Sequence, residues 1–471
     1  MVFTEPTTQS KAPGRRVAIV GGGLVGILAA LYFAKRDWNV ELFELRKDPR
    51  GTGNQASFSQ KSINLALSTR GLSALANTGL NLDEIVLNFV IPMKGRMIHL
   101  DKGELRSQPY GIFGECIYSV ERKALLELLL NTTKKFTNIK IYFQHRMKTC
   151  NFDSGLLEFE NVAEEIKVRY TADLIIGADG AYSSVRSRLM RVINMDYHQE
   201  YITHAYCELT IPPIIDDKGD LKFAMDPNHL HIWPKHTFMM IALPNLDKSF
   251  TCTLFMPNEN FDAIKTESEL INFFELYFPD SIPLIGEQRL KEYFRNPRGS
   301  LISIKCKPYH YRSRAIIIGD AAHCMVPFYG QGMNCGFQDV EILDNVFERF
   351  NVTAFRNDDN LDLDLALKEY TKFRHEDAMA ICDLAMYNYI EMRSSVVNPW
   401  YLIRRKIEGW LHWLFPTIII PLYTMVSFST VRYSDAVRRW KWQSLLLNVI
   451  GLIIGVIIAL LLNFLYKFLR E

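Results

Sequence analysis

Three glycines near the amino terminus have the spacing of a phosphate-binding turn. Gly21, Gly23 and Gly26 follow the apolar residues 17–20 in the pattern G-x-G-x-x-G. In such a turn the first glycine allows a tight bend, and the second lets a diphosphate approach the backbone. The third lets the following helix pack closely on the strand. Free N–H groups at the start of that helix attract negative charge. The chemistry indicated is the binding of a dinucleotide through its diphosphate.

The elements that must position this turn are predicted by the same stretch of sequence. Residues 17–20 are typical of a strand buried on both faces, and residues 24–35 continue as a helix. Residues 40–43 form a second strand, which Glu44 ends. An acidic residue there accepts hydrogen bonds from an adenosine ribose and would repel a 2′-phosphate. The alternative is a glycine turn in some other parallel sheet.

Two later predicted strands end beside an aspartate. The segment DLIIGADG contains Asp179, and RAIIIGDAA contains Asp320. Parallel strands bring their carboxyl ends to one edge of a sheet, where open α/β sheets bind ligands, so we expect both aspartates beside the glycine turn. Residues 201–304, which lie between these motifs, are rich in aromatic and β-branched side chains. They predict the antiparallel sheet of a second domain.

Length and composition restrict the class of protein. A chain of 471 residues is long enough for two domains and an appendage. Its 54 lysines and arginines balance 52 aspartates and glutamates, which gives no reason to expect a nucleic-acid partner. The eight cysteines form no C-x-x-C pair or zinc spacing, and the histidines between 198 and 236 lack a tight ligand pattern. We therefore expect no metal and a reducing compartment.

The carboxy-terminal segment predicts a membrane anchor. Residues 445–466 carry no charge and are long enough for one span, and basic residues flank them on both sides. Five residues follow the span, and the first sixteen residues of the chain lack the apolar segment of a secretory signal. We expect a tail anchor that leaves the catalytic domains facing the cytosol, and its basic flanks favour the mitochondrial outer membrane.

Taken in order, the three motifs resemble those of the single-component (class A) flavoprotein aromatic hydroxylases. Later segments are more specifically similar to the kynurenine 3-monooxygenase family, including IPMKGRMIH, LHIWP, GDAAH, PFYGQGMN, MYNYIEMR and IPLYTMVSFS. This resemblance covers nearly the whole chain. It implies an α/β fold with a Rossmann-like FAD-binding domain and an antiparallel-sheet substrate domain, as in para-hydroxybenzoate hydroxylase. A carboxy-terminal helical segment and a membrane anchor complete the expected architecture.

The resemblance also implies domain boundaries. The FAD-binding domain would be discontinuous, with residues 1–200 and 305–350. The substrate domain would contain residues 201–304, with strands added from about 91–111. Residues 351–440 would form a helical domain over the active site, and residues 445–466 the transmembrane helix. We interpret a second apolar run, residues 410–431, as a buried or interfacial helix covering the pocket, with a true span as the alternative.

Non-covalent FAD is the cofactor that the resemblance implies. Asp320 would lie near the ribityl chain or the pyrophosphate, and the N–H groups of Met333 and Asn334 would face the flavin O2 edge. The full set of matching positions is Gly21, Gly23, Val25, Gly26, Phe43, Glu44, Leu45, Arg46, Ala66, Arg122, Met147, Asp179, Asp320, Met333 and Asn334.

The implied reaction is hydroxylation of L-kynurenine to 3-hydroxykynurenine with NADPH and O2, a step of tryptophan breakdown toward NAD. Arg96, Tyr110 and Asn388 match the family's carboxylate-binding group, Phe328 would flank the substrate ring, and Tyr423 would close the pocket. A carboxylate can accept two charge-assisted hydrogen bonds from an arginine such as Arg96.

No catalytic acid or base is expected, since the ring's own amino group activates the neighbouring carbon. Three alternatives remain at this point. They are a membrane-anchored flavin monooxygenase of a lipid-like substrate, a non-hydroxylating FAD oxidoreductase, and a flavin-binding protein without turnover.

Overall fold

A parallel sheet near the amino terminus carries the glycine turn. The structure, a computed structural model, describes residues 14–51, 64–100, 103–355 and 360–470. The strand order is β20-β21-β12-β1-β2-β8. All neighbours run parallel except β20 and β21. Their bounds are β1 (Arg16–Val20), β2 (Asn39–Phe43), β8 (Ile139–Tyr142), β12 (Leu174–Gly177), β20 (His310–Tyr311) and β21 (Ala315–Ile317). The predicted strand–helix–strand unit is confirmed, with α1 at Leu24–Lys35.

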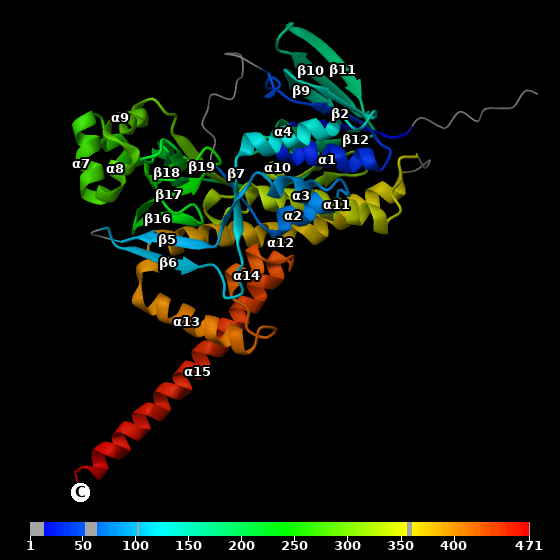
Figure 1. The fold of residues 1–471 in the computed structure, drawn as a ribbon. Coiled ribbons are helices and arrows are strands. Elements are labelled where there is room, and N and C mark those ends of the chain that lie inside the picture. The colour runs from blue at the N-terminus through cyan, green and yellow to red at the C-terminus, as the bar shows by residue number, and fades with distance from the viewer. Residues whose placement is uncertain (1–13, 52–63, 101–102, 356–359, 471) are drawn as a thin grey trace, which may run out of the picture.

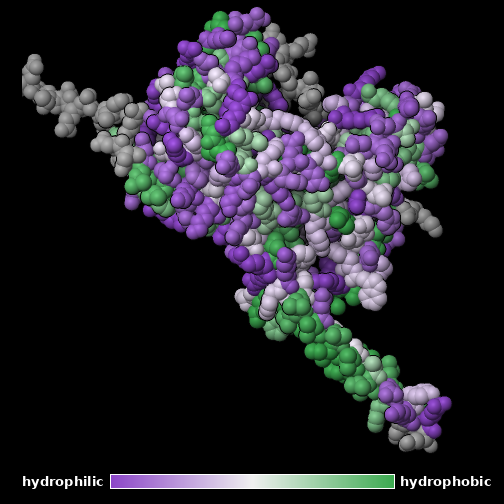
Figure 2. All heavy atoms as spheres, turned by 180° about the vertical axis from the view of Figure 1, so that it is seen from behind, coloured by the Kyte–Doolittle hydropathy of each residue, from purple (hydrophilic) through white to green (hydrophobic). Residues whose placement is uncertain are grey.

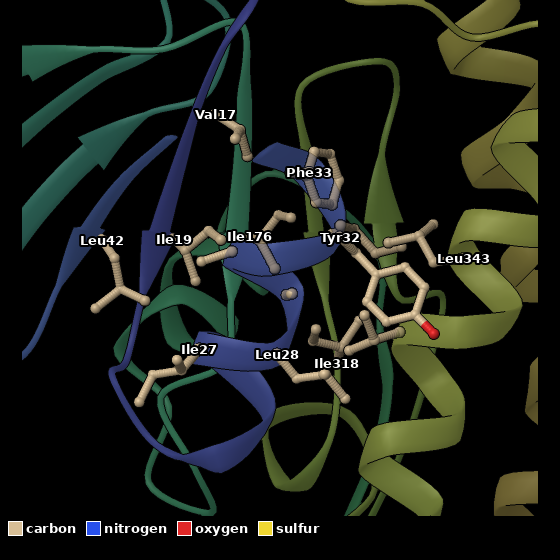
Figure 3. Packing of buried hydrophobic residues seen from close by; sticks show 14 of the residues in the cluster. Val17, Ile19, Ile27, Leu28, Tyr32, Phe33, Leu42, Ile176, Ile318 and Leu343 are labelled. Atoms are coloured by element: carbon tan, nitrogen blue, oxygen red, sulfur yellow. The ribbon is translucent and has the colours of Figure 1, made fainter. Parts of the chain in front are cut away.

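The core of this domain forms where α1 packs on the sheet (Figure 3). Ile27 and Leu28 of α1 lie against strand residues such as Ile176, and every one of these side chains is fully buried. Tyr32 points from α1 toward α11 (Gly332–Arg349) and donates a hydrogen bond to the Ala74 carbonyl at 2.7 Å. Because both faces of the sheet are covered, its strands are continuous apolar runs rather than alternating ones.

A seven-stranded sheet forms the second layer of the molecule (Figure 1). Its order is β19-β13-β18-β17-β16-β5-β6, and all neighbours are antiparallel except β16 and β5. The predicted antiparallel sheet is thus confirmed, with one parallel pair that joins the β5–β6 hairpin to it. The strands are β5 (Gly95–His99), β6 (Leu105–Pro109), β13 (Asp196–Ile211), β16 (His229–Lys235), β17 (Phe238–Pro244), β18 (Phe250–Pro257) and β19 (Gly299–Lys307).

Smaller elements complete the two layers. Three short sheets contain β3 (Leu65–Leu67), β4 (Ile91–Met93) and β7 (Ile117–Val120); β9 (His145–Asn151), β10 (Leu156–Asn161) and β11 (Ile166–Thr171); and β14 (Ile214–Ile215) and β15 (Leu221–Lys222). Other helices are α2 (Thr69–Ala76), α3 (Leu82–Leu87), α4 (Arg122–Thr133), α5 (Ser184–Leu189), α6 (Asn258–Ala263), α7 (Glu267–Tyr277), α8 (Ile282–Ile285), α9 (Glu287–Leu290) and α10 (Asp320–His323). Helices α6–α9 lie at one end of the second sheet and were not predicted from the sequence (Figure 1).

The carboxy-terminal region begins with α12 (Leu361–Arg393), which runs beneath both layers and ends near the β5–β6 hairpin (Figure 1). The helices α13 (Pro399–Leu414) and α14 (Leu422–Ser427) follow. Residues 410–431 therefore do not form one helix, which corrects our interpretation. Pro416 and Pro421 lie in the break, where proline removes a backbone donor. The short α14 lies over the pocket, as expected.

The last helix, α15 (Tyr433–Phe468), leaves the folded body alone (Figure 1). Among the described residues, it is the helix long and apolar enough to cross a membrane. Apolar side chains cover its projecting part on the face seen in Figure 2. Since α15 is continuous from Tyr433, the boundary between the domain 351–440 and the span 445–466 falls within one helix. All the domain boundaries given above remain our proposal.

Candidate active site

The glycine turn has both the tight packing and the open space that a diphosphate requires. Gly21 has a φ of +106°, and a Cβ there would collide with the Ala178 carbonyl. A Cβ on Gly26 would collide with the Gly21 carbonyl oxygen. Gly23 differs, because a Cβ there would meet nothing within 4 Å. Two glycines thus bring helix and strand together, and the third leaves the backbone accessible.

Both predicted aspartates lie beside this turn. Asp179 follows β12 and is the neighbour of Gly21, while Asp320 follows β21 on the adjacent strand. The Asp179 carboxylate accepts hydrogen bonds from the backbone of Ser184 at 2.6 Å and Val185 at 3.2 Å, which fixes the start of α5. Burial raises the pKa of Asp179. Asp320 is accessible to solvent, yet nearby protein atoms desolvate its carboxyl enough to raise its pKa.

Glu44 and Asn334 hold the surrounding backbone. Glu44 accepts hydrogen bonds from the amides of Gly22 at 2.7 Å and Arg46 at 2.9 Å. The Asn334 side chain donates to the Ala66 carbonyl at 2.7 Å and accepts from the Ser68 amide at 2.9 Å. Asn334 therefore joins α11 to β3 through its side chain, and only its backbone remains for a ligand.

The other predicted cofactor residues differ in how far their side chains are exposed. Val25 packs between Gly319 and Gly336, where α1 meets the turn after β21. The Phe43 ring stacks on Phe159 at 4.0 Å in the core, so only its backbone faces the ligand edge. Met147 is likewise a buried core side chain, while Leu45, Arg46 and Arg122 are exposed and Met333 is partly buried.

The residues present fit FAD. Backbone donors and open space at Gly23 suit a diphosphate, and the start of α11 presents further N–H groups. Glu44 suits a ribose hydroxyl, since each of its oxygens accepts one backbone hydrogen bond and retains another acceptor site.

A buried charged network stiffens the turn that carries Asp320. The Asp339 carboxylate accepts hydrogen bonds at 2.7 Å from the Gly319 amide and from Arg374 Nε, and it pairs with His323 Nε2 at 2.7 Å. Cys335 lies 3.9 Å from the other ring nitrogen. Three of these residues offer metal-ligand atoms within 4.8 Å of one another. We interpret the group as an ion-pair network, because its carboxylate is already shared among three donors.

We expect Asp339→Asn to destabilise the fold by about 3–5 kcal/mol, because it removes the buried carboxylate that lies 2.7 Å from both Arg374 Nε and His323 Nε2. Burial by itself would lower the pKa of His323 and raise the pKa of Asp339. The ion pairs outweigh burial: the carboxylate of Asp339 holds the pKa of His323 above its usual 6.5, and His323 and Arg374 hold the pKa of Asp339 below its usual 3.8. The Asp339 contribution is present above pH 3.8 and is lost as pH falls through its lowered pKa. The His323 contribution is present below pH 6.5 and is lost as pH rises through its raised pKa.

Denaturant unfolding across pH tests this prediction. The stability difference between wild type and Asp339→Asn should be largest between pH 3.8 and 6.5. Glu348→Gln, an exposed change on the same helix, is the matched control. A difference that stays constant with pH would contradict the ion-pair interpretation.

A second site lies between the seven-stranded sheet, α12 and α14. A cavity of about 60 Å³ there is lined by all five predicted substrate residues. They come from β5, the end of β6, the turn before α11, α12 and α14, and are Arg96, Tyr110, Phe328, Asn388 and Tyr423. Segments more than 300 residues apart along the chain thus meet at one cavity.

Arg96 is the charged centre of this cavity. Its side chain is buried, with Nη1 2.7 Å from Glu391 Oε1 and Nη2 3.3 Å from Asn388 Oδ1. Burial opposes its charge, but Glu391 and nearby tyrosines hold the pKa of Arg96 well above its usual value. Its buried Nε has no hydrogen-bond partner among the described residues. A permanently charged donor with one unused N–H suits a carboxylate ligand.

Aromatic rings form the walls. Tyr423 stacks on Tyr110 at 5.1 Å and on Tyr329 at 5.4 Å between ring centroids. The Arg96 guanidinium lies 4.9 Å from the centroid of the Tyr423 ring. Phe328 stacks on Tyr389 at 3.9 Å. Burial raises the pKa values of Tyr110 and Tyr423, so both hydroxyls remain protonated hydrogen-bond donors at neutral pH.

Sequence reasoning missed Glu391 and Tyr329. The signal for Glu391 was available, because it follows Asn388 by three residues and so shares its helix face. Nothing in the sequence separated Tyr329 from an ordinary core aromatic next to Phe328.

The chain matches known proteins over most of its length. Residues 15–278 and 285–348 match the family described as "FAD binding domain". The chain is 48% identical over 458 residues to kynurenine 3-monooxygenase of Drosophila willistoni, covering 96% of each protein. It is 46% identical to the enzyme of that name from Sus scrofa (92% of this chain, 88% of the relative) and 45% identical to that of Candida albicans (93% and 94%).

Solved structures share the fold at low sequence identity. The tetrameric form of 2-methyl-3-hydroxypyridine-5-carboxylic acid oxygenase superposes with a TM-score of 0.64 at 19% identity, covering 83% of this chain and 96% of that one. The p-nitrophenol 4-monooxygenase PnpA from Pseudomonas putida DLL-E4 gives 0.60 at 16% identity, with 84% and 93% covered.

Proposed function

The chain belongs to the kynurenine 3-monooxygenase family of FAD-dependent monooxygenases, and from that premise we propose that it hydroxylates L-kynurenine to 3-hydroxykynurenine with NADPH and O2. Bound FAD would supply the redox chemistry, taking electrons from NADPH and activating O2. The backbone at Gly23 and the start of α11 would hold it, with Glu44 at the ribose. The product would enter tryptophan breakdown toward NAD.

The observation that carries this proposal is the buried charged group at Arg96. L-Kynurenine has a carboxylate, an ammonium group and an aniline ring. The unused Nε of Arg96 would bind the carboxylate, and Glu391, of opposite charge, lies 2.7 Å from the same guanidinium, where the ammonium group would approach. Asn388 donates to the Phe328 carbonyl at 2.8 Å and so keeps its own oxygen aimed at Arg96.

The aromatic walls would position the ring and exclude water. Phe328 and Tyr423 line the same cavity from two different elements, the turn before α11 and the helix α14. A dry, shaped cavity favours transfer of oxygen to the ring over loss of the oxidant to water. The amino group of the substrate ring directs attack to its ortho carbon, so no side-chain base is assigned.

The α15 helix would anchor the protein in the mitochondrial outer membrane with its catalytic domains facing the cytosol. Support comes from the exposed, uncharged residues 445–466 and from the basic residues that flank them. A neutral span with basic flanks is the pattern from which we infer this membrane.

A second candidate function is oxidation of a lipid-like substrate. It is favoured by a larger cavity of about 1460 Å³, which shares Arg96, Tyr110 and Tyr423 with the smaller one and is lined by several tryptophans. This candidate gives no reason for a buried arginine with an unused donor, because an apolar substrate offers it no acceptor.

NADPH oxidation by the detergent-purified, FAD-loaded chain separates the two. We expect L-kynurenine to stimulate oxidation, and its decarboxylated analogue to act roughly 10- to 150-fold less efficiently, since a charge-assisted hydrogen bond contributes about 1.5–3 kcal/mol. Equal responses to both compounds would reject the role given to Arg96. Stimulation by the neutral hydrocarbon hexadecane, without any by L-kynurenine, would favour the lipid-like substrate.

A further inference from the structure

The helix α13 has its apolar side chains on the outside. Five of them follow one stripe at helical spacing, with the exposed fractions Trp400 79%, Ile403 49%, Ile407 49%, Trp410 61% and Leu414 40%. A helix on a water-soluble surface has the opposite arrangement, with its apolar stripe toward the core. This stripe therefore needs a covering that is not water.

Two polar side chains of α13, Arg405 and His412, face the protein instead. Arg405 donates to Gln108 Oε1 on β6 at 2.8 Å, and the buried His412 is 2.7 Å from the Ile419 carbonyl. Because these hydrogen bonds fix how α13 is rotated, the apolar stripe points outward in the folded protein and is not the product of a loosely attached helix.

Contacts with α15 place α13 at the start of the apolar span. Arg404 donates to Ser444 Oγ at 2.9 Å, and Ser444 is the residue immediately before the uncharged run 445–466. The segment between α13 and α14 is also attached to α15, because Arg439 of α15 donates to the Ile418 carbonyl at 2.9 Å. In Figure 1, α13 crosses close to the point where α15 leaves the folded body. Figure 2 shows the hydrophobic surface of α15 continuing onto the adjoining base of that body.

We infer that α13 is a second membrane contact, lying in the headgroup layer with its stripe Trp400–Leu414 toward the acyl chains. This inference rests on the proposed anchoring of α15. Tryptophan on the apolar side and basic residues beside it are typical of interfacial helices, and Arg404, Lys406 and Lys441 supply those charges here. A second copy of the chain is the competing occupant. A protein partner would not require α13 to contact α15 at Ser444, where the apolar run begins.

The inference gives the larger cavity a defined position. That cavity is lined by α13, the β5–β6 hairpin, α14 and the start of α15, and it reaches Arg96, Tyr110 and Tyr423. With α13 in the headgroup layer, the cavity opens at the membrane surface. The route to the candidate substrate site then passes along the lipid interface.

Depth-dependent fluorescence quenching in the full chain tests this inference. The partly exposed Cys116 and Cys150 are replaced by serine, and single cysteines labelled with the fluorophore NBD are introduced by Trp410→Cys, Val456→Cys or Leu276→Cys. The labelled, FAD-loaded protein is placed in vesicles of phosphatidylcholine and phosphatidylserine that carry a nitroxide quencher near the headgroup or deep in the chains.

We expect a loss of emission at position 410 with the shallow quencher, a loss at 456 with the deep quencher, and none at 276, which is on the remote helix α7. Loss at 456 without any at 410 would overturn the inference while leaving the anchor intact. Loss at neither position would overturn both. Emission at 410 that is shifted as in an apolar setting, but resists both quenchers, would show a protein partner and would also overturn the inference. Ile403→Cys, on the same stripe, repeats the test independently of how Trp410→Cys folds.

Discussion

We expect Arg96→Ala to lower kcat/KM for L-kynurenine by roughly 10- to 150-fold, because it removes a charge-assisted hydrogen bond that contributes about 1.5–3 kcal/mol. Arg96→Lys retains the charge but not the planar fork, so it should recover only part of the loss. Arg106→Ala removes an exposed arginine from the same hairpin and should leave kcat/KM unchanged. Steady-state NADPH oxidation at varied L-kynurenine checks all three variants.

A control for folding is needed, because Arg96→Ala leaves the Glu391 carboxylate without its buried partner. Adding Glu391→Gln removes that uncompensated charge, and Glu391→Gln alone measures how much of the loss of kcat/KM comes from its proposed contact with the ammonium group. The double variant should regain thermal stability without regaining kcat/KM. If it regains both, Arg96 acts through the fold and does not bind the substrate carboxylate.

Gly23→Val should weaken FAD binding by roughly 10- to 150-fold while the FAD-free protein unfolds at the same temperature as wild type. Gly23 has φ −75° and ψ 179°, which valine adopts easily, and its added atoms would meet no protein atom within 4 Å at Cβ. They would instead fill the space where a diphosphate accepts hydrogen bonds from the backbone, each contributing about 1.5–3 kcal/mol when the acceptor is charged. Flavin fluorescence during titration of the FAD-free protein measures the dissociation constant.

Two other glycines provide matched comparisons. Gly26→Val should lower both stability and FAD binding, because its side chain would collide with the Gly21 carbonyl. Gly409→Ala, in α13 and with nothing near its Cβ, should leave FAD binding unchanged and should raise stability by up to about 1 kcal/mol, because alanine favours the helix more than glycine does. Normal FAD affinity in Gly23→Val would mean that the diphosphate does not lie at this turn.

Local patterns predicted much of the fold. The bounds of α1 follow from the glycines and the apolar run, and the antiparallel sheet follows from the β-branched and aromatic residues between positions 201 and 304. The parallel pairing of β5 with β16 was not predictable, because it joins residues more than 130 positions apart that carry no local signal of their partner. The break between α13 and α14 was signalled by Pro416 and Pro421, but the apolar character of residues 410–431 hid it.

The candidate substrate site was predicted through resemblance more than through chemistry. In isolation, Arg96 is an ordinary charged residue and Asn388 an ordinary helix residue. Their contact depends on α12 passing under the β5–β6 hairpin, which no local pattern specifies. The sequence places Glu391 on the same helix face as Asn388, but its pairing with Arg96 is seen only once α12 meets the hairpin.

Oxygen transfer is the step that distinguishes a hydroxylase from a flavin oxidoreductase. The most direct test incubates the FAD-loaded chain with NADPH and L-kynurenine under ¹⁸O2 and measures the mass of the product. Our account predicts 3-hydroxykynurenine carrying one ¹⁸O atom for each NADPH consumed, apart from turnovers that release hydrogen peroxide. NADPH oxidation with recovery of unchanged L-kynurenine would contradict it, because the cavity around Arg96 would then bind the compound without oxidising it.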